Sequence, residues 1–392
     1  MKRYAEAVLN GHPDKFCDLL ADRLVAHAYH SDNVAFAQVE AAVWSDQIFL
    51  TGVIATSSAI DIDVTGIIHQ LGNEIGYTKD NHIDVSKYVI HDHICKQTKP
   101  GEDWSAYVND QCVIVGYAGY DAKTGYLPPE HYGAWFFREH VIHELHKGML
   151  KGQGPDGKLL LVMEENAGTW QLRSILLTLQ QKEGEAYANF VSVCANVLFR
   201  IYKKLQEQDD RWVSSYDEIK VLINPNGSFI EGGSDGDNGQ TGRKLVMDYY
   251  GPRIPIGGGA LYGKCLTHID RLGANAARRY ALEMVKQGAE DVTINLCYAP
   301  GLSKPMDITI QSSRRPHSDP YAYFESSNLS AQVEHSWLDY DLFKLGTFYN
   351  PYIGIHKKVS AVAQHQSMLS ALVTGGFNKI AEEERVYWNS VY

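Results

Sequence analysis

Residues 13–56, PDKFCDLLADRLVAHAYHSDNVAFAQVEAAVWSDQIFLTGVIAT, contain one helix pattern followed by two strand patterns. Pro13 suits the first turn of a helix, and apolar residues then recur at helical spacing as far as Ala28. The two strand patterns, VAFAQVEAAVW and QIFLTGVIAT, are separated only by Ser45 and Asp46. We therefore expect a helix followed by an antiparallel hairpin.

The same alternation of strands and helices returns along the rest of the chain. A second helix is expected around residues 60–75. In the middle third, GKLLLVMEE, TWQLRSILLTL and EIKVLINP predict strands, and EAYANFVSVCANVLFRIYKKLQEQ predicts an amphipathic helix. In the last third, ANAARRYALEMVKQG predicts a helix and DVTINLCYA a strand. Three comparable blocks indicate three α+β domains with largely antiparallel sheets, although no residue-level internal repeat is visible.

The expected boundaries follow from these blocks. Residues 1–97 form an N-terminal domain that contains GHPDK, and residues 110–226 form a central domain. Residues 227–392 form a C-terminal domain that contains GGGALYGK. The polar segment between the first two domains, 98–109, has no periodicity and is expected to be a mobile loop.

Composition excludes several classes of protein. The 392 residues have a formal net charge of −11, which argues against nucleic acid or an anionic membrane as a partner. The six cysteines form no CxxC pair, as expected for reduced thiols in the cytosol. The N-terminus has no apolar signal-peptide stretch, and no run reaches about 18 apolar residues, the length of a membrane span. We expect a cytoplasmic protein.

Four turns rich in Gly or Pro each carry Lys or Arg: NGHPDK (10–15), GPDGK (154–158), GSFIEGGSDGDNGQTGRK (227–244) and IPIGGGALYGKCLTHIDR (254–271). Taken singly, each could be a capped helix start or an ordinary surface turn. Taken together, they offer several cations, and three also carry an Asp suited to a hard metal ion. That combination suits a polyphosphate leaving group. No Ser-His-Asp or Cys-His pattern of familiar spacing is present, so a nucleophilic hydrolase is disfavoured. The residues alone predict a Mg²⁺-dependent enzyme that uses a nucleotide or a polyphosphate.

The motifs also resemble those of a known family. AEAVLNGHPDKFCDLLADRL, NEIGYTKD, KQT, DQCVIVGYA, PDGK, INPNGSFIEGG, GDNGQTGRK, GGGALYGK, HIDR and CYAPG follow one another in the order typical of S-adenosylmethionine synthetases. The resemblance extends from about residue 4 to about residue 378.

This resemblance implies three α+β domains related by a pseudo-threefold axis. It implies a homodimer, or a dimer of dimers, with active sites shared between subunits. The family transfers the adenosyl group of ATP to the sulfur of L-methionine and hydrolyses the released tripolyphosphate to phosphate and diphosphate. The implied cofactors are two Mg²⁺ ions and one K⁺ ion. Because a thioether sulfur carries no proton, the reaction requires charge stabilisation at the leaving group rather than a general base.

The resemblance also assigns residues. The catalytic group is expected to comprise His12, Lys15, Arg243 and Lys264. Contacts to ATP are expected from His12, Lys15, Asp156, Lys158, Ser228, Phe229, Asp237, Arg243, Lys244, Ala260 and Lys264. The acceptor would meet Val53, Gln97, Asp110, Asp237 and His268. Asp14 and Asp270 match the Mg²⁺ ligands, and Glu40 matches the carboxylate near K⁺.

Several of these positions depart from the family pattern. Val53 stands where the family has the glutamate that binds the ammonium of methionine, and His268 stands where it has a lysine linked to methionine recognition. Cys265 replaces an aspartate, Cys112 a glycine, and Ser228 the arginine that precedes the nucleotide-contacting Phe229. The loop at 98–109 is shorter than usual. The nucleotide and metal half therefore matches the family, whereas the amino-acid half is altered.

Four hypotheses remain open at this point. The chain is a divergent methionine adenosyltransferase, or it transfers the adenosyl group to another thioether. The others are a non-catalytic nucleotide-binding subunit of a hetero-oligomer and a tripolyphosphatase. The presence of His12, Asp14, Lys264 and Asp270 argues against the non-catalytic subunit.

Overall fold

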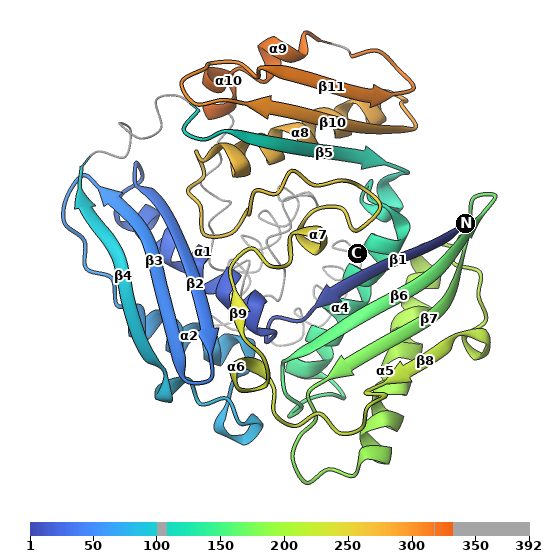
Figure 1. Ribbon diagram of the computed structural model, residues 1–392. Coiled ribbons are helices and arrows are strands. Elements are labelled where there is room, and N and C mark those ends of the chain that lie inside the picture. Colours follow the sequence, from blue (N-terminus) through green and yellow to red (C-terminus); the bar gives the residue numbers. More distant parts are fainter. Residues whose placement is uncertain (100–107, 317, 332–392) are drawn as a thin grey trace, which may run out of the picture. The chain divides into compact units, whose positions relative to one another are not determined.

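The computed structural model of the chain describes residues 1–99, 108–316 and 318–331, whose strands form three sheets (Figure 1). The first sheet, in the order β1-β6-β7-β8, consists of Lys2–Val8, Gly157–Asn166, Thr169–Leu179 and Lys220–Ile223. The second, β4-β3-β2-β9, consists of Val89–Thr98, Gln47–Thr56, Phe36–Trp44 and Gly239–Gln240. The third, β11-β10-β5, consists of Asp307–Ser312, Asp291–Tyr298 and Cys112–Gly119.

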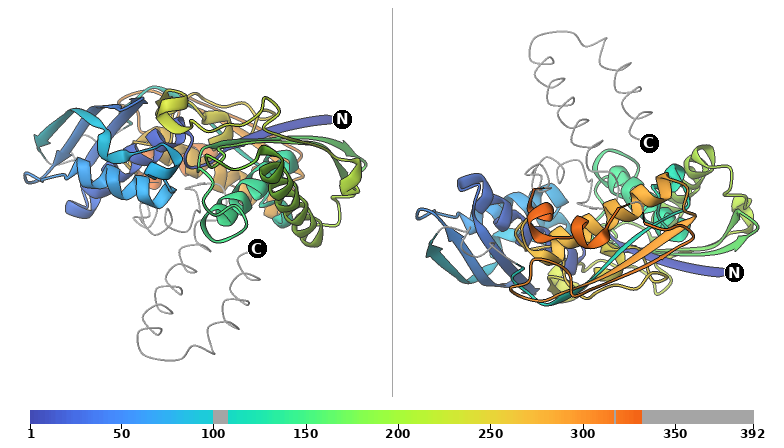
Figure 2. Two further views of the ribbon diagram at one scale, coloured as in Figure 1. Left: turned by 90° about the horizontal axis from the view of Figure 1, so that it is seen from below. Right: turned by 90° about the horizontal axis from the view of Figure 1, so that it is seen from above.

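Each sheet has a long helix packed on one face (Figures 1 and 2). Helix α1 (Pro13–Ser31) packs on β2, α4 (Pro129–Lys147) on β1 and β6, and α8 (Ile269–Lys286) on β5 and β10. Helices α2 (Val64–Ile75) and α5 (Tyr187–Gln208) pack against α1 and α4. The shorter helices are α6 (Gly233–Gly236), α7 (Leu245–Asp248), α9 (Pro320–Tyr323) and α10 (Ser326–Ser330). The 3₁₀ turns are Lys79–Asn81, Val85–Lys87, Ala122–Thr124 and Tyr216–Glu218.

The expected α+β class is confirmed. Strands β2 and β3 form the antiparallel hairpin around Ser45 and Asp46. The sheets are mainly antiparallel, with parallel pairs at β3–β4 and β7–β8. The helix expected from Pro13 and the long helix of the middle third are α1 and α5. Helix α4 was not expected, because its four histidines, four aromatic residues and several charges follow no simple apolar period.

The sheets do not follow the three consecutive ranges expected from the sequence. Strand β1, at the N-terminus, pairs with β6 in the first sheet, and β5 pairs with β10 in the third. Strand β9 joins β2 although the two are far apart along the chain. Each sheet thus takes a strand from outside its own range. Residues 100–107 of the expected 98–109 loop lie outside the described residues.

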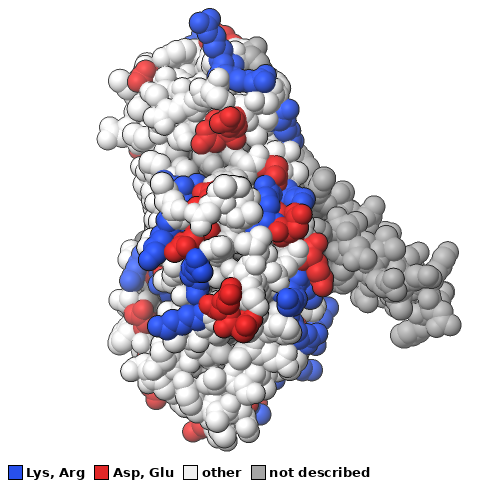
Figure 3. Space-filling view, turned by 90° about the vertical axis from the view of Figure 1, so that its right-hand side faces the viewer, with Lys and Arg blue, Asp and Glu red and all other residues white. Residues whose placement is uncertain are grey.

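Acidic and basic side chains are interspersed over the face that Figure 3 shows. This face therefore presents no continuous basic area of the kind that nucleic acid requires. Among the residues that the structure describes, no helix is both long and apolar enough to cross a membrane.

One face of α1 carries three buried aspartates, Asp14, Asp18 and Asp22, at intervals of four residues. Each accepts a backbone N–H from a glycine-rich segment of the last third of the chain. Asp14 accepts from Gln240 (2.9 Å), Asp18 from Gly242 (2.8 Å) and Asp22 from Gly263 (2.8 Å). The helix therefore fixes two distant segments by their main chains.

The second of these segments also docks on the edge of β2. The Val39 amide donates to Gly263 O at 2.7 Å, and the Cys265 amide donates to Ala37 O at 2.7 Å. Gly263 has φ +74, and a Cβ there would lie 2.1 Å from the carbonyl oxygen of Val39. Only glycine allows this approach, because a side chain would push the two backbones apart.

Comparison of two glycine variants tests this docking. Gly263→Ala should lower the free energy of unfolding by about 2 kcal/mol more than Gly258→Ala, since it also breaks hydrogen bonds to β2. Gly258 is the matched control because it too has a positive φ (+99), yet no atom lies within 4 Å of its added Cβ. Chemical denaturation of both variants measures the difference. Equal losses would show that the docking contributes nothing beyond the backbone conformation.

Candidate functional site

Each of the three long helices that pack on the sheets begins with an acid at its second position: Asp14 in α1, Glu130 in α4 and Asp270 in α8. Each acid pairs with a cation from residues 243–264. Asp14 bonds Lys244 and lies 3.4 Å from Arg243 Nε, Glu130 Oε1 lies 3.0 Å from Arg253 Nε, and Asp270 Oδ2 lies 2.6 Å from Lys264 Nζ. A single connecting segment thus supplies positive charge to all three helix N-termini.

At the start of α1, His12 is the N-cap residue. Its Nδ1 accepts a hydrogen bond from the Asp14 amide at 3.2 Å, so in the neutral ring the proton resides on Nε2. Burial, and then the charge of Lys244, lower the pKa of His12 to about 4. The residue therefore presents a neutral N–H donor at physiological pH.

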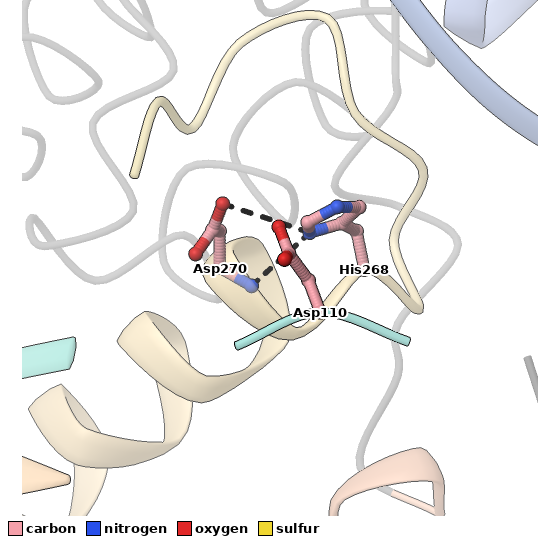
Figure 4. Close-up of side chains that lie close together, drawn as sticks. All are labelled: Asp110, His268 and Asp270. Atoms are coloured by element: carbon pink, nitrogen blue, oxygen red, sulfur yellow. Dashed lines mark hydrogen bonds and ion pairs between the residues drawn. The ribbon is translucent and has the colours of Figure 1, made fainter. Parts of the chain in front are cut away.

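The start of α8 repeats this arrangement. His268 caps the helix with the same backbone angles as His12 (φ −64, ψ 133), and its Nδ1 accepts from the Asp270 amide at 3.2 Å (Figure 4). Burial, and then the charge of Lys264, lower the pKa of His268. The sequence signal for this repeat is present as His-Pro-Asp-Lys at 12–15 and His-Ile-Asp-Arg at 268–271, but four residues were too few to be noticed as a repeat.

A second carboxylate lies beside the α8 pair. Asp110, just before β5, places its oxygen within 4.8 Å of the donor atoms of His268 and Asp270. The Cys112 thiol lies near Asp270, and burial raises the pKa of this thiol to about 12. Two of the residues expected to meet the acceptor, Asp110 and His268, therefore lie next to an expected metal ligand.

Lys15 is fully enclosed. Its Nζ lies 2.7 Å from Asp18 Oδ2 and 2.5 Å from Asp248 Oδ1, and 4.4 Å from the ring centroid of Tyr262. Burial raises the pKa of Asp18 to about 7. In this arrangement Lys15 joins α1 to α7, and the expected contact with phosphate stays a prediction. Asp18 and Asp248 were missed, although the four-residue spacing of the α1 aspartates was visible in the sequence.

Several of the expected nucleotide contacts gather around His12. The pKa of His12 responds to the charges of four nearby residues, Asp14, Lys158, Asp237 and Lys244. Lys158 pairs with Glu6 at 2.9 Å, both side chains being partly exposed. Asp156 is buried, accepts from the Gly233 amide at 2.8 Å, and has its pKa raised to about 7 by burial.

Three further nucleotide positions lie on the same glycine-rich segments. The Phe229 carbonyl accepts from the Gln181 amide at 2.6 Å, and Ser228 beside it is exposed. The Cβ of Ala260 would lie 3.1 Å from a Cβ on Gly242, so the two glycine-rich segments are adjacent there.

Val53 and Cys265 lie together in an apolar cluster. The fully buried Cys265 packs with Phe36 and Ala55, and the side chains of Tyr29 and Val53 pack against them. Two positions that depart from the family pattern are thus in one cluster, and neither carries a charge. The structure places Cys265 in the core rather than on an open surface.

Gln97 and Glu40 lie on the strands that flank Val53. Gln97 Nε2 donates to Cys95 Sγ at 3.5 Å, while its buried Oε1 has no hydrogen-bond partner among the described residues. Glu40 is half-buried, and burial raises its pKa while Lys264 opposes that shift. Val53, Gln97 and Glu40 therefore belong to one sheet, whereas Asp110 and His268 lie at the start of α8.

Comparison with known proteins gives a consistent result. The family model described as S-adenosylmethionine synthetase, N-terminal domain, matches residues 2–99, and that of the C-terminal domain matches residues 231–339. The S-adenosylmethionine synthase of Pelagibacter ubique (strain HTCC1062) is 30% identical over 315 residues, 78% of this chain and 79% of that protein. That of Acholeplasma laidlawii (strain PG-8A) is 30% identical over 322 residues, 79% of this chain and 81% of the relative. That of Rhodospirillum centenum (strain ATCC 51521 / SW) is 29% identical over 317 residues, 79% and 80% of the two chains.

Proposed function

Because this chain belongs to the S-adenosylmethionine synthetase family, we propose that it is a methionine adenosyltransferase, which makes S-adenosylmethionine from ATP and L-methionine. The methionine sulfur attacks C5′ of ATP, the S–C5′ bond forms, and the C5′–O bond breaks with its electrons on the triphosphate. The observation that carries the proposal is the pair of acid–lysine contacts, Asp14–Lys244 and Asp270–Lys264, at two capped helix N-termini.

The leaving group determines which residues matter. Negative charge collects on the triphosphate oxygens, so fixed cations and N–H donors stabilise the transition state. Lys244, Lys264 and Arg243 supply the cations. The neutral His12 supplies an Nε2–H donor, which we assign to the oxygen that leaves C5′. Because burial and Lys244 lower its pKa to about 4, His12 keeps this form well below neutral pH.

The two carboxylates fit Mg²⁺. Asp14 and Asp270 are buried, and each is now neutralised by a lysine ammonium. When those ammonium groups turn to phosphate oxygens, each carboxylate needs another cation, since a buried unpaired charge is costly. We assign one Mg²⁺ to each carboxylate, and Mg²⁺ supplies positive charge to the phosphates. Glu40 is assigned to K⁺, and hydrolysis of tripolyphosphate to phosphate and diphosphate is assigned to the same site.

We also propose a homo-oligomer, a dimer or a dimer of dimers. In the register of β2, β3 and β4, Trp44, Phe49 and Val89 share the face turned away from α1. All three are exposed (55%, 44% and 47%), and such a group of large apolar side chains is typical of an interface.

Two of the residues expected to meet the acceptor, Val53 and His268, favour weaker recognition of the two charged groups of methionine. Val53 lies against an apolar cluster, so an ammonium placed there would lose its hydration without gaining a partner. His268 is buried with a lowered pKa, so it offers no fixed positive charge for a carboxylate. Another thioether acceptor is the second candidate for the same chemistry.

Substitution of the carboxylates tests the site. Asp14→Asn and Asp270→Asn should abolish adenosyl transfer, and Lys264→Ala should slow it by about 10²–10³-fold, the scale for one preorganised donor. Glu130→Gln is the matched control, because Glu130 occupies the same helix position in α4 but is not assigned to the substrates. Product formation from Mg-ATP and methionine is measured by mass spectrometry. Near wild-type turnover in all three site variants, Asp14→Asn, Asp270→Asn and Lys264→Ala, would refute the assignment.

Analogue turnover tests the acceptor. We expect a high KM for methionine, and turnover of thioethers that lack the amine or the carboxylate. A site with a buried partner for the amine would reject the amine-free analogue by about 10⁴-fold. Val53→Glu combined with His268→Lys should shift preference back to methionine. A low-micromolar KM for methionine, with no turnover of either analogue, would contradict this expectation.

Light scattering at micromolar protein tests assembly. The wild type should have at least the mass of a dimer, and Phe49→Glu should dissociate it by burying a charge in the interface. Phe199→Glu is the matched control, since Phe199 is a similarly exposed phenylalanine (40%) on α5. A monomeric wild type that is fully active would exclude active sites shared between subunits.

A further inference from the structure

Three potential metal ligands from two segments of the chain meet at the start of α8 (Figure 4). Asp110 precedes β5, whereas His268 and Asp270 are the N-cap and second residues of α8. Their donor atoms all lie within 4.8 Å of one another. Small rotations of three side chains would therefore bring one nitrogen and two carboxylate oxygens onto a single ion.

The imidazole is already suitably oriented. His268 is only 2% exposed, and its Nδ1 lies 3.8 Å from Asp270 Oδ2. Because Nδ1 accepts the cap hydrogen bond, its lone pair rather than a proton points to the Asp270 side of the ring. An ion would take this lone pair in exchange for one amide hydrogen bond.

The charge of the cluster also calls for a cation. Two carboxylates lie together here, and the nearby ammonium is that of Lys264, 2.6 Å from Asp270 Oδ2. Arg271, the next cation, is committed to Asp22, with contacts of 3.0 and 3.1 Å. Lys264 balances Asp270, and Asp110 forms no ion pair with any residue that the structure describes, so its charge remains for an ion.

We propose that Asp110, His268 and Asp270 bind one divalent transition-metal ion of the Mn²⁺-to-Zn²⁺ series in the absence of nucleotide. An imidazole ligand favours Co²⁺, Ni²⁺ and Zn²⁺, whereas Mg²⁺ prefers oxygen ligands alone. The Cys112 thiol near the same carboxylate adds a further soft group to the surroundings. This proposal depends on the proposed function in one respect, the assignment of a metal ion to Asp270.

Helix α1 provides an internal control. His12 and Asp14 have the same cap geometry as His268 and Asp270, with Nδ1 3.9 Å from the carboxylate Oδ2. Among the described residues, the only group of three such ligands is the one at α8. At α8 Asp110 supplies the third ligand, whereas at α1 the described residues supply no third ligand at such a distance.

The experiment titrates metal-stripped, nucleotide-free protein with Co²⁺, and follows visible absorption and the heat of binding. We expect one Co²⁺ per chain. His268→Asn and Asp110→Asn should each weaken binding at least tenfold, whereas His12→Asn should not change it. Asparagine is chosen because it can still cap a helix, so the comparison does not depend on loss of the cap. Mg²⁺ should displace Co²⁺ only in large excess.

Two outcomes would overturn the proposal. One is the absence of Co²⁺ binding without nucleotide, and the other is equal binding by wild type, His268→Asn and Asp110→Asn. Circular dichroism confirms folding, and if His268→Asn does not fold, Asp110→Asn, which lies outside the helix, decides the question. Synthesis of S-adenosylmethionine from Mg-ATP is assayed on the same samples. Absence of product with Co²⁺ binding intact would refute the proposed function and leave the metal site standing.

Discussion

The row of aspartates on α1 is the constraint on which the site depends. Asp14, Asp18 and Asp22 are almost fully buried, and a buried carboxylate must be paired. Each aspartate satisfies that need twice, with a backbone amide of a glycine-rich segment and with a cation. The cations are Lys244 for Asp14, Lys15 for Asp18 and Arg271 for Asp22. The segments are therefore held where their own lysines meet the helix N-termini.

This arrangement shows that protein contacts alone hold the segments to which we assign the phosphate contacts. Lys244 and Lys264 neutralise the carboxylates that we assign to metal ions. The same groups can then exchange partners, lysine with phosphate and carboxylate with metal, without leaving a charge unpaired. The α4 N-terminus also pairs an acid with a cation, Glu130 with Arg253, but its N-cap residue is Pro128, and we assign it no role in the site.

Much of the local structure could be predicted from the sequence, but most of the pairing could not. The hairpin at Ser45 and the helix at Pro13 follow from local period and turn chemistry, which need no distant partner. Sheet membership of β1 and β5 depends on strands far along the chain, which no local pattern identifies. The resemblance named candidate residues for the site, and those assignments stay predictions. The buried tie of Lys15 to Asp248 and the contact of Val53 with the Cys265 cluster appear only in three dimensions.

Each sheet contains a strand from a distant part of the chain, and this has a consequence for how the chain folds. Strand β1 is made first, but its partner β6 begins at Gly157, and β5 waits for β10 at Asp291. Asp22 meets the Gly263 amide across 241 residues of chain. During synthesis on the ribosome no sheet can be completed in order, so apolar strand edges stay open until late. Such non-local pairing slows folding and prolongs the time during which unpaired strand edges can aggregate.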